Sequence, residues 1–343
     1  MADDIRVGLL GAGRIGRLHG GNLAGRVPGA LLTSIADVRL PAAQELAASL
    51  GVERAYEDPR RVIEDPAVDA VVICTSTDTH APLIEAAAQA GKHIFCEKPI
   101  DLDLGRIDRA LQVVAESGVT LQVGFNRRFD PSFARAQELI AGGTLGEPHL
   151  LRITSRDPEP PPIEYVKVSG GLFVDMAIHD FDMARFLIGR PVVEVYATGA
   201  VLVERAIGEA GDIDTALTTL RFEGGALGAI DNSRRAVYGY DQRIEVLCAE
   251  GAVVVGNEVA HQATVYGAEG ARGAPLKFFF LERYMESYLR EMEAFVRALQ
   301  EGAAPPAGGA DGRAAVVLAY AAKRSFDERR PVDPRKVDGG GAA

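Results

Sequence analysis

The sequence predicts an α/β protein, with an N-terminal doubly wound parallel sheet and a C-terminal α+β domain that contains a large, mostly antiparallel open sheet. The chain has 343 residues, which is long for one domain and suits two. Short apolar runs alternate with amphipathic helical segments over the first 124 residues, and after that point the pattern changes to a series of half-buried strands. We therefore expect one domain over residues 1–124, a second over residues 125–337, and a flexible tail over residues 338–343.

The first domain begins with an apolar strand, Ile5–Leu10, that ends at a glycine. A polar helical segment follows as far as about Arg26, and strands and helices then alternate. The expected strands are Leu31–Ala36, Ala70–Cys74, His93–Cys96 and Leu121–Val123, and the expected helices are Pro41–Leu50, Ala81–Ala90 and Leu104–Ser117. Repeated βαβ units of this kind require a parallel sheet with right-handed crossovers.

The second domain mixes helices with alternating strands. We expect a proline-rich loop over Asp157–Ile163. The expected helices are Pro131–Ile140, Leu172–Ile188, Phe280–Leu299 and Gly312–Asp327, and the expected strands are Pro148–Ser155, Val192–Val203, Asp214–Phe222, Ala226–Ser233, Gln242–Cys248 and Gly251–Val255. Because apolar and polar residues alternate along these strands, we expect them to be neighbours in a sheet with one covered face.

Composition and charge exclude several classes of protein. Apolar residues make up 47% and charged residues 25% of the chain, which is typical of a folded globular protein. The net charge of -11 argues against a nucleic-acid or membrane-surface partner, since both are anionic. Three widely spaced cysteines predict neither a disulfide framework nor a thiolate zinc site, and six scattered histidines predict no other metal site. The expected compartment is the reducing cytoplasm.

A dinucleotide-binding turn is expected at the end of the first strand. Gly11, Gly13 and Gly16 form GxGxxG between a strand and a helix, where the glycines permit a tight turn, close approach of a pyrophosphate and close helix packing. A plain glycine turn is the alternative. Asp37, at the end of the second strand, decides between them, because a carboxylate there can accept hydrogen bonds from a ribose and disfavours a 2'-phosphate. The predicted cofactor is NAD, although Arg39 could pair with a phosphate if it is not simply a solvated loop residue.

Lys98 is the first candidate for chemistry. It follows a strand of the parallel sheet, at the edge where strand ends open into a ligand crevice. A lysine ammonium there can polarise a substrate oxygen and take part in proton transfer. The alternative is an exposed lysine at the end of a strand.

Asp175 and His179 supply a second candidate pair. They are spaced i, i+4 in a largely apolar helical segment, and Asp182 continues the same stripe. Buried charged side chains are costly unless they are paired, so the stripe favours a cleft over a simple core, although a satisfied core histidine remains an alternative. A histidine of near-neutral pKa is a natural base for removing a hydroxyl proton, and a neighbouring carboxylate would orient it.

Four ordered segments then give the chain a family resemblance. GLLGAGRIGRLHG, VVICTSTDTHAPLIEAAAQAGKHIFCEKPIDLD, VGFNRRFD and SGGLFVDMAIHDFDMARFLIG match, in order and spacing, the large family of glucose-fructose oxidoreductase, inositol dehydrogenase and rhizopine-catabolism proteins. The resemblance covers nearly the whole chain. Within the family, FNRRFD, TSRDPEPPP, YVKVSGGLF and YGYDQR resemble the members that oxidise myo-inositol at carbon 2.

The resemblance implies an NAD-dependent oxidation of the axial hydroxyl of myo-inositol to 2-keto-myo-inositol. It implies catalytic roles for Lys98, Asp175 and His179. The implied substrate contacts, together with Asp175 and His179, are Asn126, Arg127, Asp157 and Tyr240. The expected cofactor-binding residues are Gly11, Ala12, Gly13, Arg14, Ile15, Asp37, Val38, Arg39, Thr75, Ser76, His80, Glu97 and Lys98. An uncharged polyol suits such a mixture of donors and acceptors better than an arginine clamp would.

Several alternatives stay open at this point. In some relatives the position of Asn126 is apolar and that of Asp157 is an amide, so another inositol isomer or a sugar is a possible substrate. Arg127 could form surface ion pairs, and Tyr240 could be an aromatic residue that packs against a helix. A third interpretation is a non-catalytic dinucleotide sensor. It is disfavoured because the chain contains Lys98, Asp175 and His179 together. The resemblance also implies a homotetramer formed through the open face of the second sheet.

Overall fold

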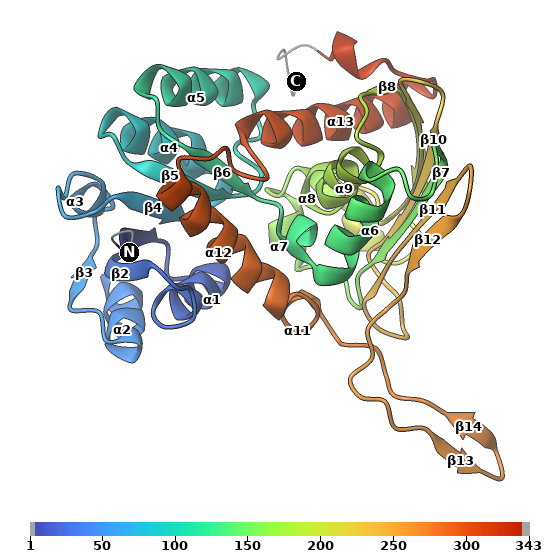
Figure 1. Ribbon diagram of the computed structural model, residues 1–343. Helices are drawn as coiled ribbons and strands as arrows, with labels where there is room; N and C mark the ends of the chain where they lie inside the picture. The colour runs from blue at the N-terminus through green and yellow to red at the C-terminus, as the bar shows by residue number, and fades with distance from the viewer. Residues whose placement is uncertain (1–3, 338–343) are drawn as a thin grey trace. The chain divides into compact units, whose positions relative to one another are not determined.

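The computed structural model describes residues 4–337 and divides the chain into two compact units (Figure 1). Among the described residues, unit 1 contains 4–129 together with 286–314. Unit 2 contains Asp130–Met285 and 315–337. The sequence placed the boundary between residues 124 and 125 and assigned everything up to residue 337 to the second domain. The predicted tail, 338–343, lies outside the described residues.

Unit 1 contains a six-stranded parallel sheet in the order β3-β2-β1-β4-β5-β6, which confirms the doubly wound prediction. The strands are β1 Ile5–Leu10, β2 Ala30–Ala36, β3 Arg54–Tyr56, β4 Ala70–Ile73, β5 His93–Glu97 and β6 Leu121–Gly124. The helices are α1 Arg14–Leu23, α2 Leu40–Leu50, α3 Arg60–Ile63, α4 His80–Gln89 and α5 Leu104–Ser117, with 3-10 turns η1 Thr77–Thr79 and η2 Asn126–Phe129. Strand β3 and helix α3 were not predicted, because segments of three and four residues carry too little periodicity.

Helix α12 (Met285–Glu301) returns to unit 1 from far along the chain. Its apolar face joins the core of the parallel sheet, where Phe95 and Phe295 meet edge to face at a centroid distance of 5.9 Å. Met292 and Val296 belong to the same buried cluster. The sequence did not predict that α12 packs in unit 1. Helical periodicity indicates which face of a helix is buried, but it does not indicate which element covers that face.

Unit 2 is built on a six-stranded mixed sheet in the order β12-β11-β7-β10-β9-β8. Only β7 and β10 run parallel, and the other neighbours are antiparallel, which confirms the predicted mostly antiparallel sheet. The strands are β7 Pro148–Arg156, β8 Val192–Ala200, β9 Thr215–Phe222, β10 Leu227–Ser233, β11 Asp241–Cys248 and β12 Ala252–Val255. A separate hairpin, β13 Val265–Gly267 with β14 Gly270–Arg272, lies apart from this sheet in Figure 1.

The helices of unit 2 are α6 Pro131–Ala141, α7 Ile163–Val166, α8 Gly171–Asp175, α9 Ile178–Ile188, α10 Arg205–Glu209, α11 Phe280–Arg283 and most of α13 Gly309–Glu328, with η3 Pro334–Lys336 at the end. Figure 1 shows α6, α8, α9 and α13 on one face of the sheet. Strand β9 shows the alternation that results: Ala216 and Leu220 are buried, whereas Leu217 is 59% exposed. None of the helices in residues 4–337 has the length and apolar character needed to cross a bilayer.

Two predicted helices are broken in the structure. The segment expected as one helix over Leu172–Ile188 forms α8 and α9, which are separated at Met176 and Ala177. The segment expected over Phe280–Leu299 forms α11 and α12, separated at Tyr284. In both cases the apolar pattern continues through the break, so the periodicity of the sequence could not reveal it.

Candidate active site

In the glycine turn of unit 1, Gly11 and Gly16 lie too close to neighbouring backbone atoms to carry a side chain, whereas Gly13 has open space beside it. Gly11 has φ +100°, and a Cβ there would lie 2.5 Å from the carbonyl oxygen of Cys74. A Cβ on Gly16 would lie 1.9 Å from the carbonyl oxygen of Gly11, so helix and strand can pack only with glycine at this position. A Cβ on Gly13 would meet nothing within 4 Å. Gly13 therefore keeps a space open beside the N-terminus of α1, where a pyrophosphate would bind.

Asp37 links this turn to the end of β2. Its two carboxylate oxygens accept hydrogen bonds from the backbone N–H of Ala12 and of Arg39, each at 2.8 Å. A carboxylate has about four lone-pair positions, so Asp37 can still accept hydrogen bonds from a ribose. Arg39 extends into solvent with its side chain 75% exposed, and its Nε lies 3.8 Å from Asp37. This placement agrees with the solvated-loop reading of Arg39.

The other expected cofactor residues lie near the carboxyl ends of β1, β2, β4 and β5 in unit 1. Arg14 and Val38 are exposed, Ile15 is half-buried and Ala12 is buried. Thr75 and Ser76 form the turn after β4, where the hydroxyls of Thr75 and Thr79 are 2.6 Å apart. These placements are those of a doubly wound nucleotide-binding sheet, in which ligands bind at the carboxyl ends of the strands.

Glu97 belongs to a buried cluster that the sequence did not indicate. Its Oε1 lies 2.8 Å from Nε2 of His19, and its side chain is 14% exposed. Glu291 of α12 brings a carboxylate oxygen to the same place, so that one atom from each of His19, Glu97 and Glu291 lies within 4.8 Å of the others. These residue types can bind a metal ion, but the hydrogen bond between His19 and Glu97 already accounts for the closest contact. The members are too far apart in sequence for any spacing rule to have found them.

Asn126 and Arg127 lie in η2, directly after β6, and both are buried in unit 1. The Nδ2 of Asn126 has no hydrogen-bond partner among residues 4–337. Buried amide donors are nearly always satisfied in folded proteins, and this one is available to a hydroxyl of a bound ligand. The neighbouring Arg128 has a structural role instead, since it forms an ion pair with Asp311 at 3.0 Å.

In unit 2, Asp175 lies at the end of α8 and His179 in the first turn of α9. Both are half-buried, whereas the residues between them are buried. One oxygen of Asp175 accepts a hydrogen bond from the hydroxyl of Tyr165, and the other accepts one from Nη1 of Arg234, both at 2.8 Å. Met176 and Ala177, which separate α8 from α9, both have right-handed helical φ and ψ angles. The i, i+4 pairing of Asp175 with His179 stays a proposal.

Arg234 is the site residue that the sequence analysis missed. It is 2% exposed, and its Nη1 lies 2.8 Å from Asp175 and 3.8 Å from Asp157. Burial acts to lower the pKa of Arg234, but Asp175 and Asp157 raise it overall. Its Nε and Nη2 have no hydrogen-bond partner in the described part of the chain. The only signal in the sequence was an arginine pair at the end of a strand, which is usually a surface feature.

Tyr165 is a second residue of the site that no sequence pattern indicated. Burial raises the pKa of its hydroxyl, and the neighbouring Asp175 raises it further. The phenol therefore stays protonated and acts as a donor to Asp175. Together, Tyr165 and Arg234 hold both carboxylate oxygens of Asp175 by hydrogen bonds.

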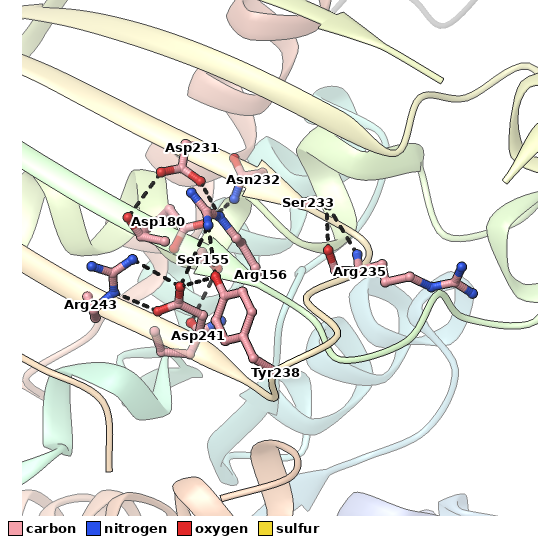
Figure 2. A network of polar contacts seen from close by, with 12 residues as sticks. Ser155, Arg156, Asp180, Asp231, Asn232, Ser233, Arg235, Tyr238, Asp241 and Arg243 are labelled. Atoms are coloured by element: carbon pink, nitrogen blue, oxygen red, sulfur yellow. Dashed lines mark hydrogen bonds and ion pairs between the residues drawn. The ribbon is translucent and has the colours of Figure 1, made fainter. Parts of the chain in front are cut away.

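A polar network that includes Arg156, Asp231 and Tyr238 lies across the second sheet (Figure 2). Arg156, next to Asp157, donates to Asp231 on β10 at 2.6 Å and to the hydroxyl of Tyr238 at 2.8 Å. Tyr238 in turn donates to Asp241 on β11 at 2.6 Å. The backbone of Asp157 is also bonded on both sides, to Ser233 and Ala236. The network therefore joins the ends of β7, β10 and β11 and positions the loop that carries Asp157.

Tyr240 is buried, and its ring packs edge to face against Phe279 at 5.6 Å and Tyr284 at 6.1 Å. This is the packing arrangement that the sequence left open as an alternative. A role of its hydroxyl in substrate binding stays a proposal.

The fold and the residues of unit 1 describe an NAD-binding oxidoreductase domain. A family model for the oxidoreductase family with an NAD-binding Rossmann fold matches residues 5–125, and a model for the GFO/IDH/MocA C-terminal domain matches residues 133–254. The chain belongs to the GFO/IDH/MocA family of oxidoreductases.

Individual relatives agree with this family. The chain is 51% identical, over 98% of its length and 100% of the relative's, to a myo-inositol 2-dehydrogenase of Thermotoga maritima. It is 39% identical, over 97% of each chain, to a scyllo-inositol 2-dehydrogenase (NAD(+)) of Bacillus subtilis. A crystal structure of a probable dehydrogenase from Thermotoga maritima matches with a TM-score of 0.96 at 50% identity, over 97% of this chain and 100% of that one.

Proposed function

We propose that the protein oxidises the axial hydroxyl of myo-inositol to 2-keto-myo-inositol with NAD as the hydride acceptor. The observation that carries the proposal is 51% identity over essentially the full length of both chains to a myo-inositol 2-dehydrogenase. The polar groups at the candidate site support it. Carboxylates, an amide and a buried arginine provide both donors and acceptors for the hydroxyls of an uncharged ring.

The residues of the chain would divide the chemistry as follows. NAD, when bound, accepts the hydride from carbon 2. His179 takes the hydroxyl proton as that hydride leaves, and Lys98 polarises the oxygen that becomes the ketone. Asp175, held by Arg234 and Tyr165, stabilises the protonated imidazole. Asn126, Arg127 and Asp157 bind the remaining hydroxyls.

The cofactor residues fit NAD better than NADP. Asp37 presents a carboxylate at the end of β2, and both of its oxygens are fixed by backbone N–H groups of the glycine turn and of Arg39. A 2'-phosphate would meet this negative charge, whereas two ribose hydroxyls would donate to it.

The test is NADH production, followed by absorbance, across a panel of myo-inositol, scyllo-inositol, D-chiro-inositol and glucose. The proposal predicts the highest kcat/KM for myo-inositol, and it fails if myo-inositol reduces no more NAD than glucose does. Oxidation of scyllo-inositol is the second candidate function, because a relative that is 39% identical carries that name. The highest kcat/KM for scyllo-inositol would select it.

We also propose a homotetramer formed through the open face of the second sheet. Apolar side chains are exposed on four of the six strands of this sheet, namely Tyr196, Leu217, Leu227 and Leu247 on β8, β9, β10 and β11. Exposed apolar patches of this kind are typical of interfaces.

We also propose a cytoplasmic location. The three cysteines are free thiols, as expected in a reducing compartment.

A further inference from the structure

Lys98 lies between two residues that are each held by a buried histidine of unit 1. On its N-terminal side, Oε1 of Glu97 is 2.8 Å from Nε2 of His19. On its C-terminal side, the carbonyl oxygen of Pro99 is 2.8 Å from Nδ1 of His80. His19 is fully buried and His80 is 2% exposed. Two imidazoles from different helices thus hold the chain on both sides of one lysine.

The ring of His19, on α1, packs against aromatic residues of β5 and α12. It meets Phe95 edge to face at 5.2 Å and Tyr288 at 5.6 Å. The 2.8 Å contact between Nε2 of His19 and Oε1 of Glu97 is a hydrogen bond that joins the ring to the carboxyl group. Because the ring cannot move without disturbing aromatic packing, the carboxylate that it holds has a defined position.

The ring of His80 joins two loops at the carboxyl edge of the parallel sheet. Nδ1 lies 2.8 Å from the carbonyl oxygen of Pro99, and Nε2 lies 3.1 Å from the carbonyl oxygen of Thr75. The segment that follows β5 is therefore bound to the turn that follows β4. His80 was expected to bind the cofactor, but both of its ring nitrogens face backbone carbonyls. This geometry fits a role in holding the backbone.

We propose that His19 and His80 are positioning residues that act through Lys98. The inference rests on the proposed catalytic role of Lys98. A lysine side chain has a flexible four-carbon stem, and fixing it costs about 2 kcal/mol of rotamer entropy. The ammonium group therefore has a defined position only if the backbone that carries the side chain is rigid. The two histidines supply that rigidity, and a misplacement of about 1 Å at the reacting centre can cost about 100-fold in rate.

The test is a double-mutant cycle between each histidine and Lys98. His19→Phe keeps the aromatic ring but removes the donor, and His80→Leu removes the bonds to Pro99 and Thr75. We expect each to lower kcat about 10- to 100-fold for NAD-dependent oxidation of myo-inositol. In a Lys98→Met background, the same substitutions should change the residual kcat by less than about twofold, because there is no longer an ammonium to position.

Two conservative variants serve as rescue controls. The amide nitrogen of glutamine can replace Nε2 of a histidine, and that of asparagine can replace Nδ1, so His19→Gln and His80→Asn should recover most of the kcat. His93→Phe is the matched control. His93 lies on β5 and accepts a hydrogen bond from the backbone N–H of Thr120 at 3.1 Å, away from Lys98, so its loss should leave kcat within about twofold.

The variants distinguish a failure of the positioning role of the histidines from a failure of the catalytic role of Lys98. Equal losses in the Lys98 and Lys98→Met backgrounds would overturn the positioning role and indicate a purely structural one. If Lys98→Met alone leaves kcat unchanged, the proposed role of the lysine fails instead. Should His19→Phe or His80→Leu not fold, the Gln and Asn variants decide, because a loss of kcat in those variants despite a retained donor contradicts the inference.

Discussion

Arg234 and Tyr165 fix the carboxylate of Asp175, and these contacts bear most directly on which residue of the site takes up the proton. Both oxygens of Asp175 accept hydrogen bonds at 2.8 Å, one of them from a buried guanidinium. An anion held in this way can stabilise a histidinium without itself taking up the proton. His179 is therefore the better candidate for the proton acceptor.

His179→Ala should lower kcat by about 10²- to 10⁴-fold, the range expected for the loss of a general base. NADH binding, followed by fluorescence, should stay unchanged, since the glycine turn and Asp37 belong to unit 1. His149→Ala is the control, because His149 is an exposed histidine of β7 in the same unit. A His179→Ala protein that keeps its kcat but loses NADH affinity would contradict the assignment.

At the scale of single residues, the sequence indicated which residues have the right chemical type for the site, but it did not indicate which residues contact one another. Asp37, Lys98 and His179 could be proposed because strand ends and polar positions in apolar segments are visible in a sequence. Arg234 and the pair of His19 and Glu97 could not. Their partners lie 59 and 78 residues away, and no local pattern records such a distance.

Among the elements, the glycine turn between β1 and α1 makes the clearest prediction. Gly16→Ala should destabilise the protein by about 3 kcal/mol or more, because the new Cβ would lie 1.9 Å from a backbone carbonyl oxygen that cannot move aside. Gly13→Ala should fold normally, since the space around Gly13 is open. That space is reserved for the pyrophosphate, so Gly13→Ala should weaken NAD binding about tenfold, or about 1.4 kcal/mol.

Chemical denaturation and NADH titration of the two variants provide the test. The assignment of the turn is wrong if Gly13→Ala binds NADH like the parent protein.

The network that joins β7, β10 and β11 should make stability depend on pH. Burial opposes ionisation of Asp241, but hydrogen bonds from Arg243, Tyr238 and Asn257 lower its pKa overall. A carboxyl group with a lowered pKa in the folded state stabilises the fold above its unfolded pKa of about 3.9. The contribution is lost as the pH falls through the lower folded-state value.

Asp241→Asn should therefore reduce the free energy of unfolding by about 3 kcal/mol at pH 7, and the difference from the parent should shrink towards pH 3. Urea denaturation at several pH values measures this. Asp327→Asn removes an exposed i, i+4 pair with Lys323 and should cost about 0.5 kcal/mol or less. A difference for Asp241→Asn that is constant from pH 7 to pH 3 would exclude the electrostatic explanation.

The elements themselves could be predicted well where they are long and periodic. The βαβ order of unit 1 and the strands of unit 2 follow directly from their apolar patterns. The breaks at Met176 and Tyr284 could not be seen, because an apolar residue continues the pattern whether or not the backbone stays helical. Nor could the return of α12 to unit 1, which depends on Phe295 meeting Phe95.

For the whole molecule, the exposed face of the second sheet predicts an assembly. Leu217 on β9 and Leu227 on β10 are 59% and 50% exposed on this face. A double substitution of both leucines by arginine would bury charge in the proposed interface, so it should reduce the mass measured by light scattering from four chains to two or one.

Leu202→Arg serves as the control, since Leu202 is 74% exposed but lies in a loop outside the sheet. An unchanged mass for the double variant, or a monomeric parent protein, would show that this face is not the interface.

The central claim is that one myo-inositol molecule meets both the nicotinamide and His179. A crystal structure of the protein with NAD and myo-inositol tests it most directly. We expect carbon 2 of the inositol to lie against the nicotinamide ring, with its hydroxyl oxygen within about 3.2 Å of a ring nitrogen of His179. An inositol bound with carbon 2 turned away from the nicotinamide, or with His179 beyond hydrogen-bonding reach of its hydroxyl, would contradict the account.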